Sequence, residues 1–185
     1  GRMPASAPAY EPVKNDVDLG YLVEVDPRHL KIILDESFFF ERGESTLSED
    51  SKAKLQAIMS AYSEQIFSKE KLKERLQNIH IVGHSSPVFE GKYIEPSSAS
   101  TKAYQFNMHV SLERAKSIVS IIVDDNVDLP YKNEIRSKLI VSGKSFSEPR
   151  PLPRGPASLA QMRCGGFDCS SSQRVEIIFE LEKED

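Results

Sequence analysis

A stripe of apolar side chains within residues 107–123 is the feature that most constrains how this chain can fold. Its members recur at the three- and four-residue spacing of one helix face: Met108, Leu112, Ala115, Ile118, Val119 and Ile122. Asn107, Ser111 and Arg114 form a polar row beside the stripe, within roughly 60° of arc at about 100° per residue. The pattern predicts a helix from about residue 108 to 124 that packs on a core and carries a polar border.

A second amphipathic helix is predicted to begin after Ser48, a residue type that caps helix N-termini. Glu49 and Asp50 follow in the first turn, where the helix dipole favours negative charge. One apolar face then comprises Leu55, Ile58, Met59, Tyr62 and Ile66. Residues 68–76 are charged and are predicted to continue as a further helical piece.

Strand-like segments alternate with the helices. Apolar runs at residues 31–34, 37–40, 78–82 and 138–141 predict short strands. Residues 174–181 alternate in polarity, which predicts a strand with one face on a core and the other largely in water. The apolar face of this strand consists of Val175, Ile177, Phe179 and Leu181. The order of elements predicts an α+β fold of the βαβαββ type, a two-layer sandwich with the helices packed on one face of a small mixed sheet.

The folded domain is predicted to span residues 30–183. Residues 1–29 are expected to be a linker or surface strap, because residues 1–18 are rich in Pro, Ala and charge and lack periodicity. The start Gly1-Arg2-Met3 resembles a tag remnant, so a membrane anchor is expected outside this sequence. Long loops are predicted at residues 85–106 and 145–172, and loops of such length are usually functional or disordered.

Composition and cysteine spacing exclude several classes of function. The formal net charge of -4 argues against a nucleic-acid partner, which normally requires a basic excess. Cys164 and Cys169 can form a disulfide in an oxidising compartment, and two free thiols are the alternative. A zinc site is not expected, because two thiolates need two further ligands and no His is near in sequence. We therefore expect neither a metal nor a cofactor.

His84, followed by Ser85 and Ser86, raises the question of hydrolase activity. A nucleophilic Ser–His pair needs an orienting acid and an oxyanion hole, and the Gly-x-Ser-x-Gly turn of many hydrolases is absent. We therefore expect that the chain is not an enzyme. The polar row of Asn107, Ser111 and Arg114 is a better candidate site, because it is predicted at a helix N-terminus, where free N–H groups attract anions. An ordinary solvated helix border is the alternative.

Five segments resemble, in the same order, motifs of the OmpA-like and MotB-like peptidoglycan-binding domains. They are residues 39–47, 79–86, 107–115, 140–143 and 172–177. The third segment is similar to the signature helix of the family, which reads Asn, two residues, an aliphatic residue, Ser, two residues and Arg-Ala. The resemblance covers about residues 30–182 and implies the OmpA-like fold.

The resemblance implies a periplasmic domain of a Gram-negative bacterium that anchors an outer-membrane or motor-stator-like protein to the cell wall. The implied partner is the diaminopimelate-containing stem peptide of peptidoglycan. In the family, a loop Asp faces the ammonium group of diaminopimelate and a helix Arg faces its carboxylate. The residues implied in ligand binding are Ser85, Ser86, Asn107, Val110, Ser111, Arg114 and Arg174.

Ser86 occupies the position of the family's Asp and brings no charge. Loss of a charge-assisted hydrogen bond costs on the order of 1.5–3 kcal/mol, or about tenfold in affinity and more. Glu90 and Glu95 in the following loop are candidates to replace the charge, and Gln173 replaces a usual Arg. Two functions stay open: a peptidoglycan anchor, and a protein-interaction or homodimerisation module whose glycan site has degenerated.

Overall fold

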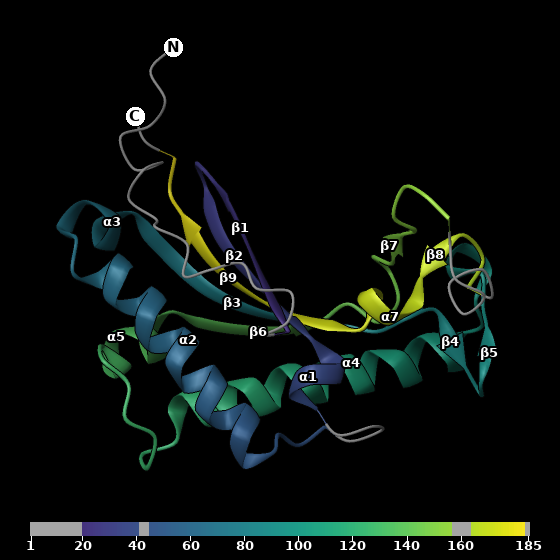
Figure 1. The fold of residues 1–185 in the computed structure, drawn as a ribbon, viewed down its shortest axis with the longest axis horizontal. Coiled ribbons are helices and arrows are strands. Elements are labelled where there is room, and N and C mark those ends of the chain that lie inside the picture. Colours follow the sequence, from purple (N-terminus) through teal and green to yellow (C-terminus); the bar gives the residue numbers. More distant parts are fainter. Residues whose placement is uncertain (1–19, 41–44, 157–163, 184–185) are drawn as a thin grey trace.

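The computed structural model describes residues 20–40, 45–156 and 164–183, and its centre is a five-stranded mixed sheet in the order β1-β2-β9-β3-β6 (Figure 1). The strands are β1 (Tyr21–Asp26), β2 (His29–Asp35), β3 (Leu76–His84), β6 (Leu139–Gly143) and β9 (Arg174–Leu181). β3 and β6 pair in parallel, whereas the other neighbours are antiparallel. The predicted α+β architecture with a small mixed sheet is confirmed.

The helices lie in a second layer on one face of this sheet (Figure 1). The two long helices are α2 (Glu49–Phe67) and α4 (Thr101–Val123), and the short ones beside them are α1 (Glu36–Phe39), α3 (Glu70–Arg75) and α5 (Lys132–Lys138). Ser48 caps α2 as predicted, because its side chain accepts a hydrogen bond from the Ser51 amide at 3.2 Å. None of the helices described in residues 20–40, 45–156 and 164–183 is long and apolar enough to cross a membrane.

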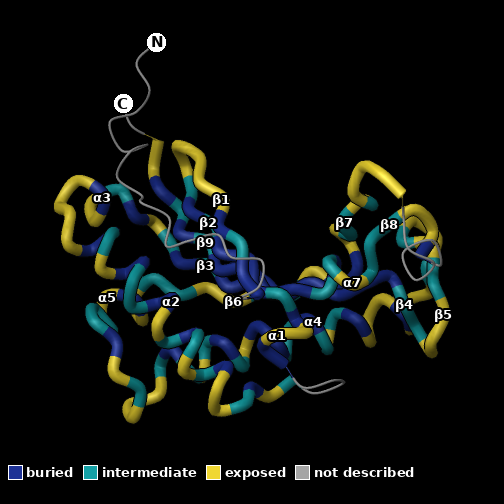
Figure 2. Tube along the Cα trace, viewed as in Figure 1, coloured by how far each residue is buried: buried dark blue, intermediate teal, exposed yellow. Residues whose placement is uncertain are grey.

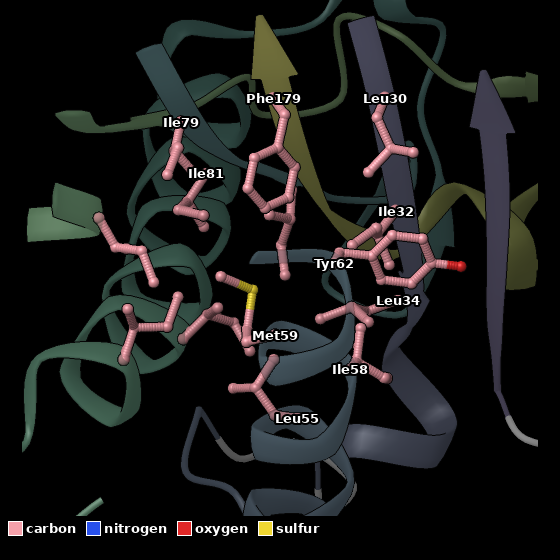
Figure 3. Close-up of a cluster of buried hydrophobic side chains, with 14 of the residues drawn as sticks. Leu30, Ile32, Leu34, Leu55, Ile58, Met59, Tyr62, Ile79, Ile81 and Phe179 are labelled. Atoms are coloured by element: carbon pink, nitrogen blue, oxygen red, sulfur yellow. The ribbon is translucent and has the colours of Figure 1, made fainter. Parts of the chain in front are cut away.

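The core fills the space between the two layers (Figure 3). Leu30, Ile32 and Leu34 of β2 are fully buried, as are Ile177 and Phe179 of β9. The five apolar positions predicted for α2 are all buried against them. Each large apolar side chain removed from water contributes roughly 1.5–3 kcal/mol, so this interface stabilises the fold.

Part of the segment expected to be a linker is a strand. Residues 21–26 form β1, which pairs antiparallel with β2 and places Tyr21 opposite Leu34. Tyr21 and Val23 are buried on the helix-covered face, whereas Val25 is 40% exposed. Only Tyr21 and Val23 show the alternation of buried and exposed positions that is typical of a strand, and acidic residues follow them. The sequence pattern was therefore too short to predict this strand. The predicted linker at residues 1–18 and the tag remnant lie outside the described residues.

The predicted strand at residues 37–40 is instead the short helix α1. The Asp35 side chain accepts from the Ser37 amide at 2.9 Å and caps this turn. Phe39 and Phe40 are buried, whereas Phe38 is 42% exposed. An aromatic run of this length favours a strand, and the Asp cap outweighs that preference.

Both predicted loops contain regular structure. Residues 85–106 include β4 (Val88–Phe89), β5 (Lys92–Tyr93), a 3-10 helix (Pro96–Ser98) and the first turns of α4. Residues 145–172 include β7 (Arg150–Pro151), β8 (Phe167–Asp168) and α7 (Cys169–Ser172), while residues 157–163 lie outside the described part. Together with the start of α4, these elements form a lobe beyond the end of the sheet (Figures 1 and 2).

The start of α4 corrects the prediction that matters most for the site. Ser100 caps the helix by accepting from the Ala103 amide at 3.2 Å, so α4 begins well before the expected residue 108. Asn107, Ser111 and Arg114 are therefore in the helix interior, where the backbone N–H groups are already paired. The predicted attraction of an anion to a helix N-terminus does not apply to these residues.

Candidate functional site

The carboxyl ends of three strands meet at one edge of the sheet. β2 and β3 both pair antiparallel with β9, so they run in the same direction, and β6 runs parallel to β3. This edge gathers Glu36, which follows β2, Ser85 and Ser86, which follow β3, and Ser145, which follows β6. The middle of α4 lies against the same edge, since Ser111 is in direct contact with the ends of β3 and β6.

Two glycines make this close approach possible. A Cβ atom on Gly83 would lie 1.8 Å from the carbonyl oxygen of Ser111, and one on Gly143 would lie 2.8 Å from Ser111 Oγ. These glycines are needed because no side chain fits between the strands and the helix, not because of an unusual backbone angle. The glycines and the serine of the family-like motifs therefore act here as packing residues.

Ser111 and Asn107 tie the surrounding loops to α4. Ser111 Oγ donates to the Met108 carbonyl at 3.0 Å and accepts from the Ser145 amide at 3.1 Å. The Ser145 carbonyl in turn accepts from the Ser85 amide at 2.8 Å. The Asn107 side chain donates to the Val88 carbonyl at 3.2 Å and to the Ala103 carbonyl at 3.0 Å. Asn107 and Ser111, both predicted ligand residues, thus fix the loops that frame the site.

Arg114 forms a buried ion pair with Glu36. Arg114 Nη2 contacts Glu36 Oε1, and each side chain is about one-tenth exposed. Burial raises the pKa of Glu36 although the charge of Arg114 opposes this, and burial lowers the pKa of Arg114 although the charge of Glu36 opposes that. Arg114 Nε and Glu36 Oε2 are buried without a hydrogen-bond partner in the described parts of the chain. An internal carboxylate thus occupies the guanidinium expected to bind the ligand.

Ser86 and Gln173 form a second contact at this edge. Gln173 Nε2 donates to Ser86 Oγ at 2.6 Å, and the Gln173 carbonyl accepts from the Glu36 amide at 3.3 Å. Gln173 therefore bridges the segments that carry Ser86 and Glu36, which sequence reasoning missed because it treated Gln173 only as a lost Arg. Ser85 Oγ is buried without a hydrogen-bond partner among the residues described.

Glu95 and Val110 contribute differently from the rest of the predicted set. The Glu95 carboxylate accepts from Tyr93 Oη at 3.0 Å and from Ser97 Oγ at 3.2 Å, so it is engaged within its own loop. Val110 is half-buried on α4, one residue before Ser111.

Cys164 and Cys169 form a disulfide in the structure, with Cα atoms 6.0 Å apart. This bridge lies in the lobe, within the segment that carries β8 and α7.

Arg174 faces away from the helices. It pairs with His84 in the β3–β9 ladder, and the next residue, Val175, faces the core. Its Nε donates to Glu176 Oε2 at 2.8 Å, and its Nη1 donates to the Ser172 carbonyl at 2.9 Å. The structure therefore brings Ser85, Ser86, Ser111 and Arg114 to one edge and places Arg174 on the opposite face of the sheet.

Glu176 is the centre of a cluster of basic side chains that the sequence did not reveal. Its carboxylate lies 2.8 Å from Arg174 Nε, 3.4 Å from His84 Nε2, 3.8 Å from Lys31 Nζ and 4.0 Å from Arg150 Nη2. Burial alone would raise its pKa, but the contacts with His84 and Arg174 outweigh burial and lower the pKa to about 2. The expected wet face of β9 therefore contains a buried carboxylate, only 5% exposed.

Comparison with solved structures supports the fold. The cell wall anchor of the T6SS from Pseudomonas aeruginosa is 17% identical, with a TM-score of 0.56 over 98% of this chain and 100% of that chain. The periplasmic domain of Helicobacter pylori MotB (residues 78–256) is 16% identical, with a TM-score of 0.53 over 88% and 82% of the two chains. A putative MotB-like protein from Desulfovibrio vulgaris is 17% identical, with a TM-score of 0.53 over 92% and 83%.

Comparisons of the sequence with family models and with curated proteins find no significant match. The comparison with solved structures therefore shows the shared fold. The chain has the OmpA-like/MotB-like fold that its motifs predict.

Proposed function

We propose that this chain is a non-catalytic, periplasmic cell-wall-anchoring domain that binds peptidoglycan non-covalently. The observation that carries the proposal is the convergence of Ser85, Ser86, Ser111 and Arg114 at one sheet edge, from two separate family-like motifs. The shared fold with a domain described as a cell wall anchor supports it.

The ligand class proposed is a stem peptide with diaminopimelate, which presents an ammonium group beside a carboxylate. The Arg114 guanidinium is suited to the carboxylate, because its planar N–H groups form paired, charge-assisted hydrogen bonds. Ser85 Oγ has no partner in the described residues, and Ser86 Oγ on the next residue accepts one hydrogen bond from Gln173, so both hydroxyls offer acceptors for the ammonium group. No step of this binding requires a metal or a covalent intermediate.

Retention on purified sacculi tests the proposal. Arg114→Ala alone would leave Glu36 buried and unpaired, which costs roughly 3–5 kcal/mol, so the informative variant is the double change Glu36→Ala/Arg114→Ala. We expect the wild type to be retained and the double variant to lose at least about tenfold in affinity, as befits a lost charge-assisted contact. Arg136→Ala, at an exposed arginine on α5, is the matched control and should bind like the wild type. Equal retention of the folded double variant contradicts the proposal.

A protein-interaction or homodimerisation module is the second candidate. The observation that favours it is that both halves of the expected clamp already have an internal contact, Arg114 with Glu36 and Ser86 with Gln173. A site with no free charge offers little to a zwitterionic ligand. In this reading the OmpA-like fold is kept and the glycan site has degenerated.

Ser86→Asp separates the two candidates. If only the loop charge is missing, the new carboxylate should strengthen sacculus binding by about tenfold or more. A charge-assisted contact contributes about 1.5–3 kcal/mol, and about 1.4 kcal/mol corresponds to tenfold in affinity. The Gln173 amide that now donates to Ser86 can donate equally to the carboxylate. Ser98→Asp adds the same charge at an exposed position and controls for net charge. A folded Ser86→Asp variant that gains nothing over Ser98→Asp favours the interaction module.

A further inference from the structure

We infer that Glu36 is an internal competitor for the ligand carboxylate. In the free domain Arg114 stays paired with Glu36 until a ligand displaces the Glu36 carboxylate. The inference rests on the proposed function and deepens it, because it assigns a regulatory role at the same site to a residue outside the signature helix. It concerns one contact, between the first residue of α1 and the middle of α4.

The first argument is position. Glu36 immediately follows β2 at the sheet edge where Ser85 and Ser86 follow β3. Its carboxylate oxygen contacts Arg114 Nη2, the type of nitrogen that a ligand carboxylate would use. Nη2 carries two N–H groups, but a second carboxylate beside Glu36 would place two negative charges against one guanidinium in a buried space, which is unfavourable. The ligand carboxylate and the Glu36 carboxylate therefore compete for Arg114.

The second argument is that the internal pair is incomplete. A guanidinium has five N–H donors, and a carboxylate that binds it through two parallel hydrogen bonds satisfies more of them than a single contact does. Here Arg114 Nε and Glu36 Oε2 are left buried and unpartnered within the part of the chain that is described. Unpaired buried polar atoms are costly, so the closed pair is less stable than a fully bonded one. A ligand carboxylate that engages both Nε and Nη2 would recover that loss.

The third argument is that release requires little movement of the backbone. The backbone around Glu36 is held by the hydrogen bond from its amide to the Gln173 carbonyl and by the buried side chain of Phe39. The side chain of Glu36 has no bond other than the one to Arg114 in the described residues. A change of rotamer, rather than a rearrangement of α1, is therefore enough to free Arg114.

The experiment compares wild type, Glu36→Gln and Glu134→Gln, which removes the same charge from an exposed position on α5. Binding is measured with purified sacculi and with a soluble stem tripeptide that ends in meso-diaminopimelate. If the pair is closed in nine-tenths of the free molecules, its release raises the apparent affinity about tenfold. We expect this gain for Glu36→Gln with both probes, no gain for Glu134→Gln, and loss of the gain in Glu36→Gln/Arg114→Gln.

The outcomes separate the inference from the proposed function. Wild-type binding that Glu36→Gln leaves unchanged or weakens, with the protein folded by circular dichroism, overturns the competitor role and leaves peptidoglycan binding intact. A gain that persists in the Arg114→Gln background also overturns it, because the gain would then not act through Arg114. Absence of binding by every variant, Ser86→Asp included, rejects the proposed function and the competitor role together.

Discussion

Gly83→Ala is expected to lower the free energy of unfolding by about 3 kcal/mol or more, the upper end of what overpacking costs. The added Cβ would lie 1.8 Å from the backbone carbonyl oxygen of Ser111, so neither a rotamer change nor a flexible side chain can relieve the clash. Relief requires α4 to move away from the end of β3, which also breaks the contacts of Ser111 with Ser145. Urea unfolding followed by circular dichroism measures the effect.

Two control variants calibrate this prediction. Gln77→Ala changes an exposed position on the same strand and should alter stability by less than about 0.5 kcal/mol. Gly143→Ala should cost less than Gly83→Ala, because its Cβ would meet Ser111 Oγ at 2.8 Å and the Leu112 amide at 2.9 Å. A Gly83→Ala protein as stable as Gln77→Ala would show that α4 does not contact β3 as described.

Glu176→Gln is expected to cost roughly 3–5 kcal/mol at pH 7, because it leaves the buried guanidinium of Arg174 without its carboxylate partner. Arg174 is the member most affected, since it is as deeply buried as Glu176 and donates to it at 2.8 Å. Glu24→Gln, at an exposed position on β1, is the matched control and should be close to neutral. Equal stability of the two variants would contradict the account of the cluster.

The pH dependence of the same residue has a defined sign. The pKa of Glu176 is lowered in the folded domain from an ordinary value of 4.5 to about 2. Its contribution to stability is therefore fully present above pH 4.5 and is lost as the pH falls through about 2. At 1.36 kcal/mol per pKa unit the loss amounts to about 3 kcal/mol. Glu176→Gln should show a smaller loss of stability than the wild type between pH 4.5 and pH 2.

The helices and strands that the sequence predicted correctly share strong periodicity. The apolar positions of α2 and the alternation of Val175, Ile177 and Phe179 each identify a buried face without reference to the rest of the chain. α1 and the start of α4 were missed because a single capping side chain decides them, Asp35 in one case and Ser100 in the other. Such caps outweigh the local propensity of the residues that they precede.

The candidate site, like the fold, could be predicted from the sequence only in part. The signature residues of α4 could be identified from their order, but their partners could not, because Glu36, Gln173 and Ser145 reach them from distant segments. Glu176 was assigned to a wet face because alternation reports polarity and not burial. Arg150 of β7 reaches Glu176 from the lobe, and the two-residue strands of the lobe leave no periodic signal in the sequence.

Chemical-shift mapping with a stem tripeptide that ends in meso-diaminopimelate is the most direct test of peptidoglycan binding at the sheet edge. The account predicts saturable shifts of the backbone amides of residues 84–86, 111–114 and 143–145, together with the side-chain Nε–H signal of Arg114. It predicts no comparable change at α5, on the other side of the domain from the lobe (Figure 1). Saturable shifts confined to other surfaces, or none at millimolar tripeptide for both wild type and Glu36→Gln, would contradict the account.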